Sequence, residues 1–416
     1  MSLHIPPALK HRRFFYLWAG LLVSLAGSQM QLSAIFWHIR TLTGTPDPFA
    51  LGAIGLARIL PIVVFSFLAG PVADSFNRRT ILFITQTVMT LTALALALLT
   101  FSGHIQLWHI YALTAVQAAA GAFDLPARQA MVPNLVPTRD LPNAFSLQSI
   151  AANTGSVAGP LLGGVVIASL GQGYTYLFNA ISFLAVLVAL VLIGPVTQDR
   201  TRSTGVTLSA FRDGVRFILS RPMILSTMLL DFVATFFASA NTMMPIVARD
   251  LLKVGEVGYG VLSSAQAVGS VVAGLIISQL HFIRRQGPTF LWAVVIFGCA
   301  TVVFGVSHVF VLALLALMGM GAADAVSTII RNTIRQLQTP DHLRGRMTSI
   351  NQVFFQGGPQ LGEVEAGIVA QLFGVPFCII SGGIGCILGV ALIAVRWPQV
   401  RRYNGDEPQP AAGPAD

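Results

Sequence analysis

The chain has 416 residues, of which 54% are hydrophobic and 10% charged, with a formal net charge of +9. Soluble domains carry about 25% charged residues, so this composition excludes a soluble globular protein and indicates a membrane protein. The three cysteines, Cys299, Cys378 and Cys386, all fall in apolar runs, which predicts buried thiols and excludes a disulfide framework or a zinc site.

The chain opens with a basic segment, KHRR at 10–13, followed by an apolar run to about residue 39. This order resembles a secretory signal peptide, but the run lacks an A-x-A-type cleavage site and further apolar runs follow. We therefore expect a retained first span.

Apolar runs of about 20 residues, the length that crosses a hydrocarbon core of about 30 Å, recur along the whole chain. They predict an all-α membrane protein of twelve transmembrane helices in two six-helix bundles. The spans are expected at 14–39, 50–73, 80–101, 106–130, 142–168, 174–194, 222–248, 257–280, 288–305, 307–330, 347–372 and 375–396. The domains are expected to be an N-terminal bundle at 1–194, a cytoplasmic linker at 195–221, a C-terminal bundle at 222–400 and a disordered tail at 401–416.

Lysine and arginine predict the orientation, because they concentrate in cytoplasmic loops. All but four of the 25 basic residues lie on the side of the termini; the exceptions are Arg40, Arg58, Arg249 and Lys253. Both termini are therefore expected in the cytoplasm. The basic excess follows from this topology and does not indicate a nucleic-acid partner.

The linker contains the segment TLSAFRDGVRFIL at 207–219. Its apolar residues Leu208, Phe211, Val215 and Leu219 share one helical face, which predicts a short helix on the cytoplasmic membrane surface.

The two halves are related in sequence. Residues 136–164 align without gaps with residues 339–367, which places Gly164 on Gly367, and the same offset places Arg128 on Arg331. Such a duplication implies two bundles of like orientation around a pseudo-twofold axis along the membrane normal. Parallel repeats of this kind are typical of transporters, with the substrate site at their interface.

Three stretches carry short motifs. The loop after the second span reads GPVADSFNRR (70–79), the fourth span ends in FDLPARQ (123–129), and the fifth contains GSVAGPLLGG (155–164).

Asp124 and Arg128 share a helix face, which predicts a local ion pair with a structural or gating role. The alternative for Asp124 is that it carries a proton. Asp324 and Arg331 lie in the corresponding part of the tenth span, also on one face. The small residues of the fifth span let helices approach closely, and Pro160 permits a kink.

These motifs resemble those of the major facilitator superfamily, over nearly the whole chain. GPVADSFNRR is similar to its cytoplasmic G-x-x-x-D-R-x-G-R-R motif, with Gly70, Asp74, Arg78 and Arg79 in place and Ser75 and Asn77 departing from it. The resemblance implies a cytoplasmic latch at this loop; the alternative is a solvated loop that follows the positive-inside rule.

GSVAGPLLGG is similar to the motif associated with antiporters of the superfamily. The glycines and the proline that match it are Gly155, Gly159, Pro160, Gly163 and Gly164. FDLPARQAMVPNLVP (123–137) and LQTPDHLRGRM (337–347) resemble the branch that contains the bacterial enterobactin exporter and macrolide and drug effluxers.

Polar residues also form stripes inside apolar spans. Gln31 and His38 share a face of the first span, Gln117 aligns with Asp124 in the fourth, and Asp231 lies deep in the seventh. Such residues are expected to face a water-filled cavity or to bond between helices, and the resemblance implies that spans 1, 4, 7 and 10 line a central cavity. His38 could instead be interfacial. Arg58 in the second span could snorkel, pair with a carboxylate or contact an anionic substrate.

The eleventh span contains GGPQLGEVEAG at 357–367, with two carboxylates in an apolar run. Gln356 and Glu363 fall on one polar face, whereas Glu365 points about 200° away from Glu363 at 100° per residue. We expect Glu363 to face the cavity and to exchange protons or bind cargo, and Glu365 to have a supporting or extracellular-side role.

The repeat predicts a transporter, and the resemblance to this branch together with the fifth-span motif implies a proton-coupled exporter of an amphipathic small molecule, such as a drug or a secreted siderophore, in the bacterial cytoplasmic membrane. The alternatives are uptake of a small nutrient and, in another class, a receptor or scaffold that does not transport. A monomer without metal or cofactor is expected, with protons and the lipid bilayer as its other partners. The chain contains no G-x-x-x-x-G-K-[ST] loop, no G-x-S-x-G and no H-E-x-x-H motif, so we predict neither its own ATPase site nor an enzyme.

Overall fold

In the computed structural model, residues 6–196, 215–237, 240–279 and 284–405 are described, and their secondary structure is helical wherever it is regular. Within these ranges the side chains at 66, 67, 70, 71, 73, 74, 240, 341–346, 348–350 and 352–356 lie outside the description. The long helices of the first half are α1 (Arg12–Leu42), α2 (Pro48–Ser75), α3 (Arg78–Phe101), α4 (Leu107–Met131), α5 (Leu141–Leu170) and α6 (Gln172–Ile193). Those of the second half are α8 (Pro222–Phe237), α10 (Gly255–Ser278), α11 (Gln286–Val306), α12 (Phe310–Gln338), α13 (Asp341–Phe373) and α14 (Val375–Arg396).

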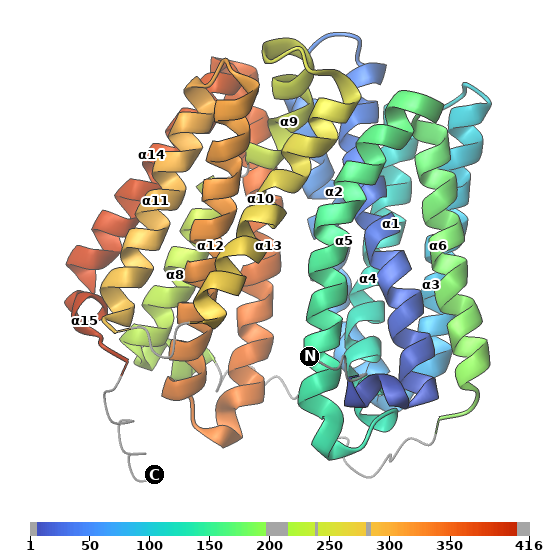
Figure 1. Ribbon diagram of the computed structural model, residues 1–416, viewed down its shortest axis with the longest axis horizontal. Coiled ribbons are helices and arrows are strands. Elements are labelled where there is room, and N and C mark those ends of the chain that lie inside the picture. The colour runs from blue at the N-terminus through green and yellow to red at the C-terminus, as the bar shows by residue number, and fades with distance from the viewer. Residues whose placement is uncertain (1–5, 197–214, 238–239, 280–283, 406–416) are drawn as a thin grey trace. The chain divides into compact units, whose positions relative to one another are not determined.

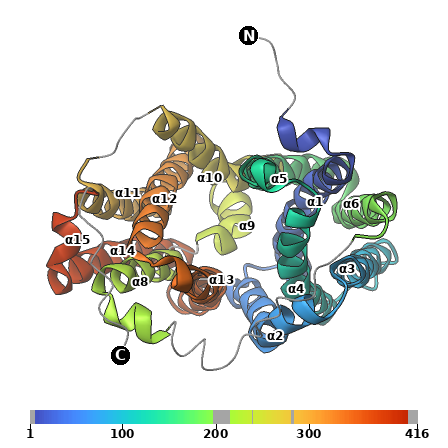
Figure 2. The same cartoon turned by 90° about the horizontal axis from the view of Figure 1, so that it is seen from below.

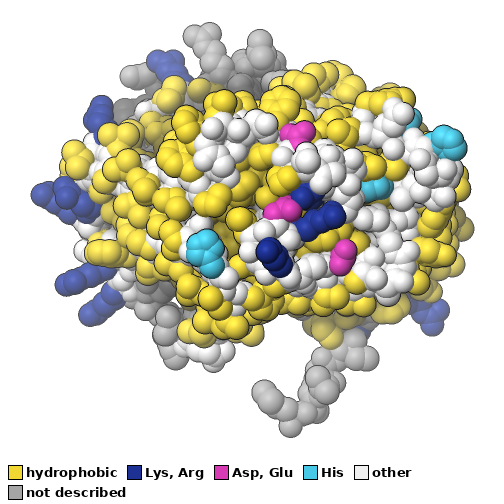
Figure 3. All heavy atoms as spheres, turned by 90° about the horizontal axis from the view of Figure 1, so that it is seen from above, with side chains coloured by type: hydrophobic (Ala, Val, Ile, Leu, Met, Phe, Trp, Pro, Cys, Tyr) yellow, Lys and Arg dark blue, Asp and Glu magenta, His cyan; other side chains and the backbone are white. Residues whose placement is uncertain are grey.

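Each predicted span corresponds to a helix, and within the described part of the chain ten helices are long and apolar enough to cross a membrane. The other two, α4 and α13, are less apolar because α4 carries Asp124 and Arg128 and α13 carries Glu363 and Glu365. Large apolar side chains remain exposed on the helices, among them Leu372 at 70% and Val395 at 72%. Such exposed side chains are compatible with a hydrocarbon environment and not with water. Figure 3 looks along the helices onto one end of the molecule, where acidic, basic and histidine side chains lie among hydrophobic ones.

The predicted bounds differ from the helices in places. The seventh span extends over Pro222–Leu251 and contains α8 (Pro222–Phe237) and the short helices η5 (Ala240–Met243), α9 (Met244–Ile246) and η6 (Val247–Leu251, a π-helix), with residues 238–239 outside the described residues. The tenth span continues to Gln338 instead of 330. The predicted tail begins too early, because α15 (Pro398–Arg402) contains its first residues and Tyr403 is buried; residues 406–416 lie outside the described residues.

Only the end of the predicted linker helix is described. Residues 215–220 are helical, with Ile218 buried against Ile224, Met228 and Met347 and Leu219 exposed. Leu208 and Phe211 lie outside the described residues.

The helix bounds confirm the repeat. Gly171 separates α5 from α6 and Gly374 separates α13 from α14, and these two glycines occupy equivalent places in the two halves. Both have positive φ angles, 93° and 89°, which residues with a Cβ adopt only under strain. A glycine therefore marks the same sharp turn between the last two long helices of each half.

The chain divides into two compact units. Unit 1 contains α1, α3–α6, the part of α2 from Leu56 and the start of α10 up to Ser264. Unit 2 contains the first residues of α2 up to Gly55, α8, α9, the rest of α10 and α11–α15. The halves thus exchange one short segment each.

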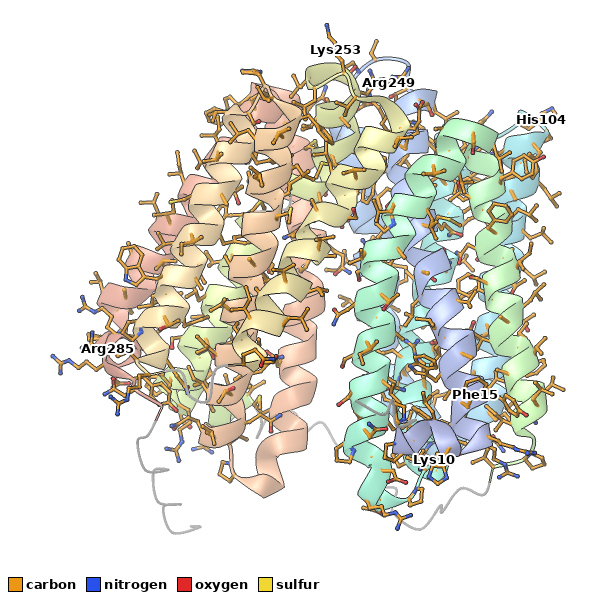
Figure 4. All side chains as sticks on the ribbon, in the orientation of Figure 1. Lys10, Phe15, His104, Arg249, Lys253 and Arg285 are labelled. Atoms are coloured by element: carbon orange, nitrogen blue, oxygen red, sulfur yellow. The ribbon has the colours of Figure 1, made fainter. Side chains whose placement is uncertain are left out.

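In unit 1, α1 packs against α5 and α6, and α3 packs against α4 and α6 (Figures 1 and 2). In unit 2, α11 packs against α12 and α14, and α8 packs against α13 and α14. Lys10 and Phe15 lie at one end of the helices of unit 1 and His104 at the other (Figure 4). Arg285 and Arg249 likewise lie at opposite ends of unit 2, as expected for loops that alternate between two sides.

Glycines allow the two exchanged segments, Asp47–Gly55 and Lys253–Ser264, to pack closely against the helices of their units. A Cβ built on Gly164 of α5 would lie 2.9 Å from the Cα of Gly260 in α10. A Cβ on Gly367 of α13 would lie 2.8 Å from the Cα of Gly52 in α2. Gly164 and Gly367 are the pair that the repeat aligns, so each half uses the same position to bring two backbones into contact.

Candidate functional site

A cavity of about 180 Å³ lies within unit 2, among helices that are otherwise apolar. Three charged side chains line it: Asp324 and Arg331 from α12 and Glu363 from α13. The polar residues Asn241, Thr242 and Gln266 and the apolar residues Val294 and Phe297 complete much of the wall. The side chain of Asp324 is 43% exposed, whereas that of Arg331 is 3% exposed. A carboxylate that reaches a cavity beside a buried guanidinium is a candidate site for proton exchange or ligand binding.

Arg331 is the centre of the charged cluster. Its Nη2 lies 3.0 Å from Oδ1 of Asp231, and its Nη1 lies 3.6 Å from Oδ1 of Asp324. The same Nη1 donates a hydrogen bond to Oγ of Ser327 (3.0 Å). Residues 324, 327 and 331 share one face of α12 because they are three, four and seven positions apart. Asp324 and Arg331, which were predicted to share a helix face, contact each other and line the cavity together with Glu363.

Asp231 of α8 is buried and contacts two arginines of α12. Its side chain is 3% exposed, and Oδ2 accepts from Nη2 of Arg335 at 3.4 Å in addition to the contact of Oδ1 with Arg331. Arg335 also donates from Nη2 to the carbonyl of Thr227 (3.3 Å). Asp231 is not part of the cavity lining, and its contacts with Arg331 and Arg335 of α12 match the alternative of bonding between helices.

Arg335 was not predicted as part of the site. Its position close to the end of an apolar run suggested a cytoplasmic loop, but α12 continues past it and Arg335 is only 2% exposed. The one sequence signal is its distance of four residues from Arg331, which places both guanidinium groups on one helix face.

Glu363 and Glu365 differ as the helical spacing predicts. Glu363 is buried and lines the cavity with Pro359, one turn earlier on α13. Glu365 is half-buried and is not part of this lining. The side chain of Gln356, predicted on the same face as Glu363, lies outside the described residues.

In unit 1 the predicted Asp124–Arg128 pair is present, with Nε of Arg128 3.6 Å from Oδ2 of Asp124. Asp124 is 4% exposed, and its Oδ1 accepts from Nε2 of Gln86 (2.7 Å) and Oγ1 of Thr85 (3.1 Å). All three partners lie within unit 1. Asp124 is therefore enclosed by donors, whereas Asp324 opens to a cavity.

Gln31 and Gln117 bond to each other. Nε2 of Gln31 donates to Oε1 of Gln117 (2.6 Å), and Nδ2 of Asn179 donates to Oε1 of Gln31 (2.7 Å). His38 is buried at 5% exposure, with Nδ1 3.0 Å from the hydroxyl of Tyr176. These contacts match the alternative of hydrogen bonding between helices of one bundle.

The residues of the predicted latch are only partly described. The side chain of Asp74 and the surroundings of Gly70 lie outside the described residues. Nη1 of Arg78 donates to the carbonyl of Ala130 (2.8 Å), and Nε of Arg79 donates to the carbonyl of Leu190 (2.8 Å). Both arginines thus contact helix ends within unit 1. Arg58 is half-buried in α2.

The glycines of the fifth span pack α5 on α1. A Cβ on Gly159 would lie 2.7 Å from the carbonyl oxygen of Ala26, and one on Gly155 would lie 3.0 Å from the carbonyl carbon of Leu25. Gly163 faces Met30 and Gly164 faces Gly260, and the carbonyl oxygen of Pro160 also faces Gly260. The predicted close packing is confirmed, with α5 continuous across Pro160. Among the described residues no group of three His, Cys, Asp or Glu side chains is placed to hold a metal ion.

The sequence of the whole chain decides the family. A family model described as "Transmembrane secretion effector", one of the major facilitator families, matches residues 5–412. The chain belongs to this family. It is a multi-pass membrane transporter for small molecules and not an enzyme.

Two kinds of characterised relative are similar over most of their length. The multidrug efflux pump Tap of Mycolicibacterium fortuitum is 26% identical over 391 residues, which cover 91% of this chain and 94% of the pump. The enterobactin exporter EntS of Citrobacter koseri is 27% identical over 349 residues, which cover 83% of this chain and 82% of the exporter.

Solved transporters share the fold at low identity. A bacterial homologue of the human lysosomal transporter Spinster, in an inward-facing and unoccupied conformation, matches with a TM-score of 0.69 at 14% identity and covers 96% of this chain and 97% of its own. A POT family transporter in complex with 5-aminolevulinic acid matches with a TM-score of 0.72 at 13% identity, covering 94% of this chain and 96% of its own. These likenesses confirm the predicted major facilitator fold.

Proposed function

We propose that the protein is a proton-coupled exporter of amphipathic small molecules in the bacterial cytoplasmic membrane, with both termini in the cytoplasm. Export is supported by the names of the relatives, a multidrug efflux pump and an enterobactin exporter. The orientation is supported by the concentration of arginine on the side of the termini. Cargo would cross by alternating access, in which the two units move against each other.

The observation that carries proton coupling is that two carboxylates, Asp324 and Glu363, line one cavity between apolar helices. Ionisable residues at membrane depth are costly and mark ion or proton pathways. Asp324 is the more accessible acid, and it shares Arg331 with Asp231. When Asp324 takes up a proton its attraction to Arg331 weakens, and Arg331 remains paired with Asp231.

In this proposal Asp231 and Arg335 are positioning residues. Arg335 contacts the same carboxylate, and Asp231 keeps Arg331 in place through the cycle. Glu363 exchanges a proton or contacts the cargo from the opposite helix, and Glu365 supports the outer part of α13. The latch at Asp74, Arg78 and Arg79 and the pair Asp124–Arg128 would stabilise one end of unit 1.

Transport in proteoliposomes tests this function. Purified protein would first be screened for stabilisation by siderophores, macrolides and organic cations, and the stabilising compounds would then be assayed for flux under an imposed pH gradient. We expect Asp324→Asn and Glu363→Gln each to lower proton-driven flux at least about tenfold, which is about 1.4 kcal/mol of barrier. Exchange of labelled for unlabelled cargo without a gradient should persist in Asp324→Asn.

Glu256→Gln is the matched control, because Glu256 lies in the first turn of α10 and outside the cavity lining. It should retain wild-type coupling. Full pH-driven flux in both cavity variants would contradict the assignment of the coupling site. Flux directed only into the cytoplasm would instead support uptake of a small nutrient.

A further inference from the structure

The cavity of unit 2 combines a charged part with a neutral part. The charged part contains Asp324 and Arg331 of α12. The neutral part contains the amides of Asn241 in η5 and Gln266 in α10 and the ring of Phe297 in α11. Binding pockets for small organic molecules have this composition, in which apolar surface supplies area and a few polar groups fix the orientation.

The charge that an entering group meets is that of Asp324. The side chain of Asp324 is 43% exposed, whereas that of Arg331 is 3% exposed and Glu363 is 9% exposed. Asp324 contacts Nη1 of Arg331 at 3.6 Å and Oγ1 of Thr328 at 3.5 Å. In the described part of the chain both contacts use Oδ1, so Oδ2 remains available to a ligand.

Arg331 is much less available to a ligand. Its Nη2 lies 3.0 Å from Oδ1 of Asp231, and its Nη1 donates to Oγ of Ser327 at 3.0 Å. An anion would have to displace one of these neighbours and would be repelled by the exposed carboxylate of Asp324. A cation can pair with Asp324 while Arg331 keeps its contacts with Asp231 and Ser327. The cavity therefore favours a cation over an anion.

The neutral part of the lining indicates an organic cation. Nδ2 of Asn241 donates to Oε1 of Gln266 (2.9 Å), and the carbonyl oxygen of Asn241 can accept an N–H from a ligand. Val294 and Phe297 supply apolar surface for carbon substituents, and aromatic rings attract ammonium groups. A hard metal ion would instead require six or more oxygen ligands. An ammonium group with a hydrocarbon arm uses both parts of the lining.

The volume of the cavity limits what it can hold. Its 180 Å³ corresponds to about six water molecules at about 30 Å³ each. A small aryl-alkyl amine has this size, whereas a whole macrolide or siderophore is several times larger. The cavity is therefore suited to a small amine or to the amine-bearing end of a larger molecule.

We propose that the cavity of unit 2 is a subsite for an organic ammonium group. The carboxylate of Asp324 binds the ammonium, and Val294 and Phe297 contact its hydrocarbon part. The inference rests on the proposed transport function, because it names the class of cargo that the same cavity takes, amphipathic amines in preference to anions.

The test uses three probes of similar size and different charge on the purified full-length protein in a non-ionic detergent. At neutral pH phenylbutylamine is a cation, phenylbutanol is neutral and phenylbutyrate is an anion. Isothermal titration calorimetry would measure the dissociation constant of each. We expect the amine to bind at least about tenfold more tightly than the alcohol, which corresponds to about 1.4 kcal/mol, and the anion to bind more weakly than the alcohol.

Three variants locate the binding. Asp324→Asn keeps the shape of the side chain and removes its charge, so the amine should lose its advantage over the alcohol. Ala323→Leu adds bulk to the lining and should weaken the binding of both amine and alcohol. Glu256→Gln removes a carboxylate from the first turn of α10, outside the lining, and should keep the full preference for the amine. The melting temperature of each variant without ligand verifies that it is folded.

Equal affinity of the wild type for amine and alcohol would overturn the proposal, and so would a tenfold preference that survives in Asp324→Asn. Tighter binding of the anion than of the amine would show a site on Arg331 and would also overturn it.

The failure of this inference can be distinguished from that of the proposed function. If the amine has no advantage but Asp324→Asn still loses proton-driven flux, the subsite is wrong and the proposed coupling stands. If the amine preference depends on Asp324 but Asp324→Asn and Glu363→Gln keep full proton-driven flux, the subsite stands and the proposed coupling is wrong.

Discussion

Arg331 lies between two carboxylates whose surroundings differ. Asp231 is 3% exposed and contacts two guanidinium groups, whereas the side chain of Asp324 is 43% exposed and contacts one of them at a longer distance. The repeat sharpens the comparison, because Arg128 aligns with Arg331, while Asp124, the partner of Arg128, aligns with Ser327. Unit 2 thus has Ser327 at the position of the acid that pairs with Arg128 in unit 1. Arg331 instead contacts Asp231 on α8 and Asp324 at the cavity.

The buried contact between Asp231 and Arg335 leads to a prediction about stability. Removing one member of a buried ion pair leaves an uncompensated charge and costs about 3–5 kcal/mol. We expect Asp231→Asn to destabilise the protein on this scale, and the double variant with Arg335→Gln to be less destabilised than the sum of the single variants. The free energy of unfolding in mixed micelles measures the difference, which for residues in contact is about 0.5–3 kcal/mol.

The control cycle combines Arg335→Gln with Asp140→Asn. Asp140 belongs to unit 1, where its Oδ2 lies 2.9 Å from Nε2 of His11. These two changes should add. An additive result for Asp231 and Arg335 as well would mean that their contact contributes nothing specific to the fold.

The residues of the site were predictable to different degrees. Glu363 and Asp324 follow from charge inside an apolar run, because burying a carboxylate in a membrane is costly and requires a reason. Asp231 on α8 and Arg331 on α12 are 100 positions apart in the sequence. Helical spacing predicts contacts only between residues of the same helix, so it could not predict this one. Arg335 was missed because composition cannot distinguish an arginine in a basic loop from one in a helix whose carboxylate partner lies elsewhere in the fold.

At the scale of the element, α5 packs on α1 through glycines, and this gives a matched pair of substitutions. A Cβ on Gly159 would lie 2.6 Å from the Cβ of Gln29, closer than real side chains approach. Gly159→Ala must therefore separate the two helices, and we expect it to lower the free energy of unfolding by about 1–3 kcal/mol.

Gly274 of α10 has open space at the same point and an ordinary φ angle. Because alanine favours helix over glycine, Gly274→Ala should leave the protein unchanged or stabilise it by up to about 1 kcal/mol. Thermal unfolding of both variants checks the pair. Equal effects would show that α5 and α1 adjust without cost at Gly159.

Helix bounds were predicted well where a glycine or a loop ends an apolar run, as at Gly171 and Gly374. They were less informative in the seventh span, where the apolar run contains the 3-10 helix η5 after α8. Asn241 and Thr242 of η5 line the cavity. Hydropathy reports the environment of a segment and not its backbone path, so this part of the lining could not be predicted.

At the scale of the whole molecule, the duplication explains why one pattern of turns and glycine contacts occurs twice. It does not fix which side of the membrane carries the termini, which rests on the arginine distribution. Within each unit, however, the structure shows which positions lie at opposite ends. Lys10 and His104 do so in unit 1, and Arg285 and Arg249 in unit 2 (Figure 4).

Single cysteines at these four positions test the orientation. The background would first be cleared of its cysteines, of which Cys299 is exposed and Cys378 and Cys386 are buried. A membrane-impermeant maleimide on intact cells should label His104→Cys and Arg249→Cys and spare Lys10→Cys and Arg285→Cys. Inverted vesicles should give the reverse pattern. Labelling of Lys10→Cys from outside would contradict cytoplasmic termini. Opposite behaviour of Lys10→Cys and Arg285→Cys would require an odd number of crossings between them, and with it a topology that the repeat does not allow.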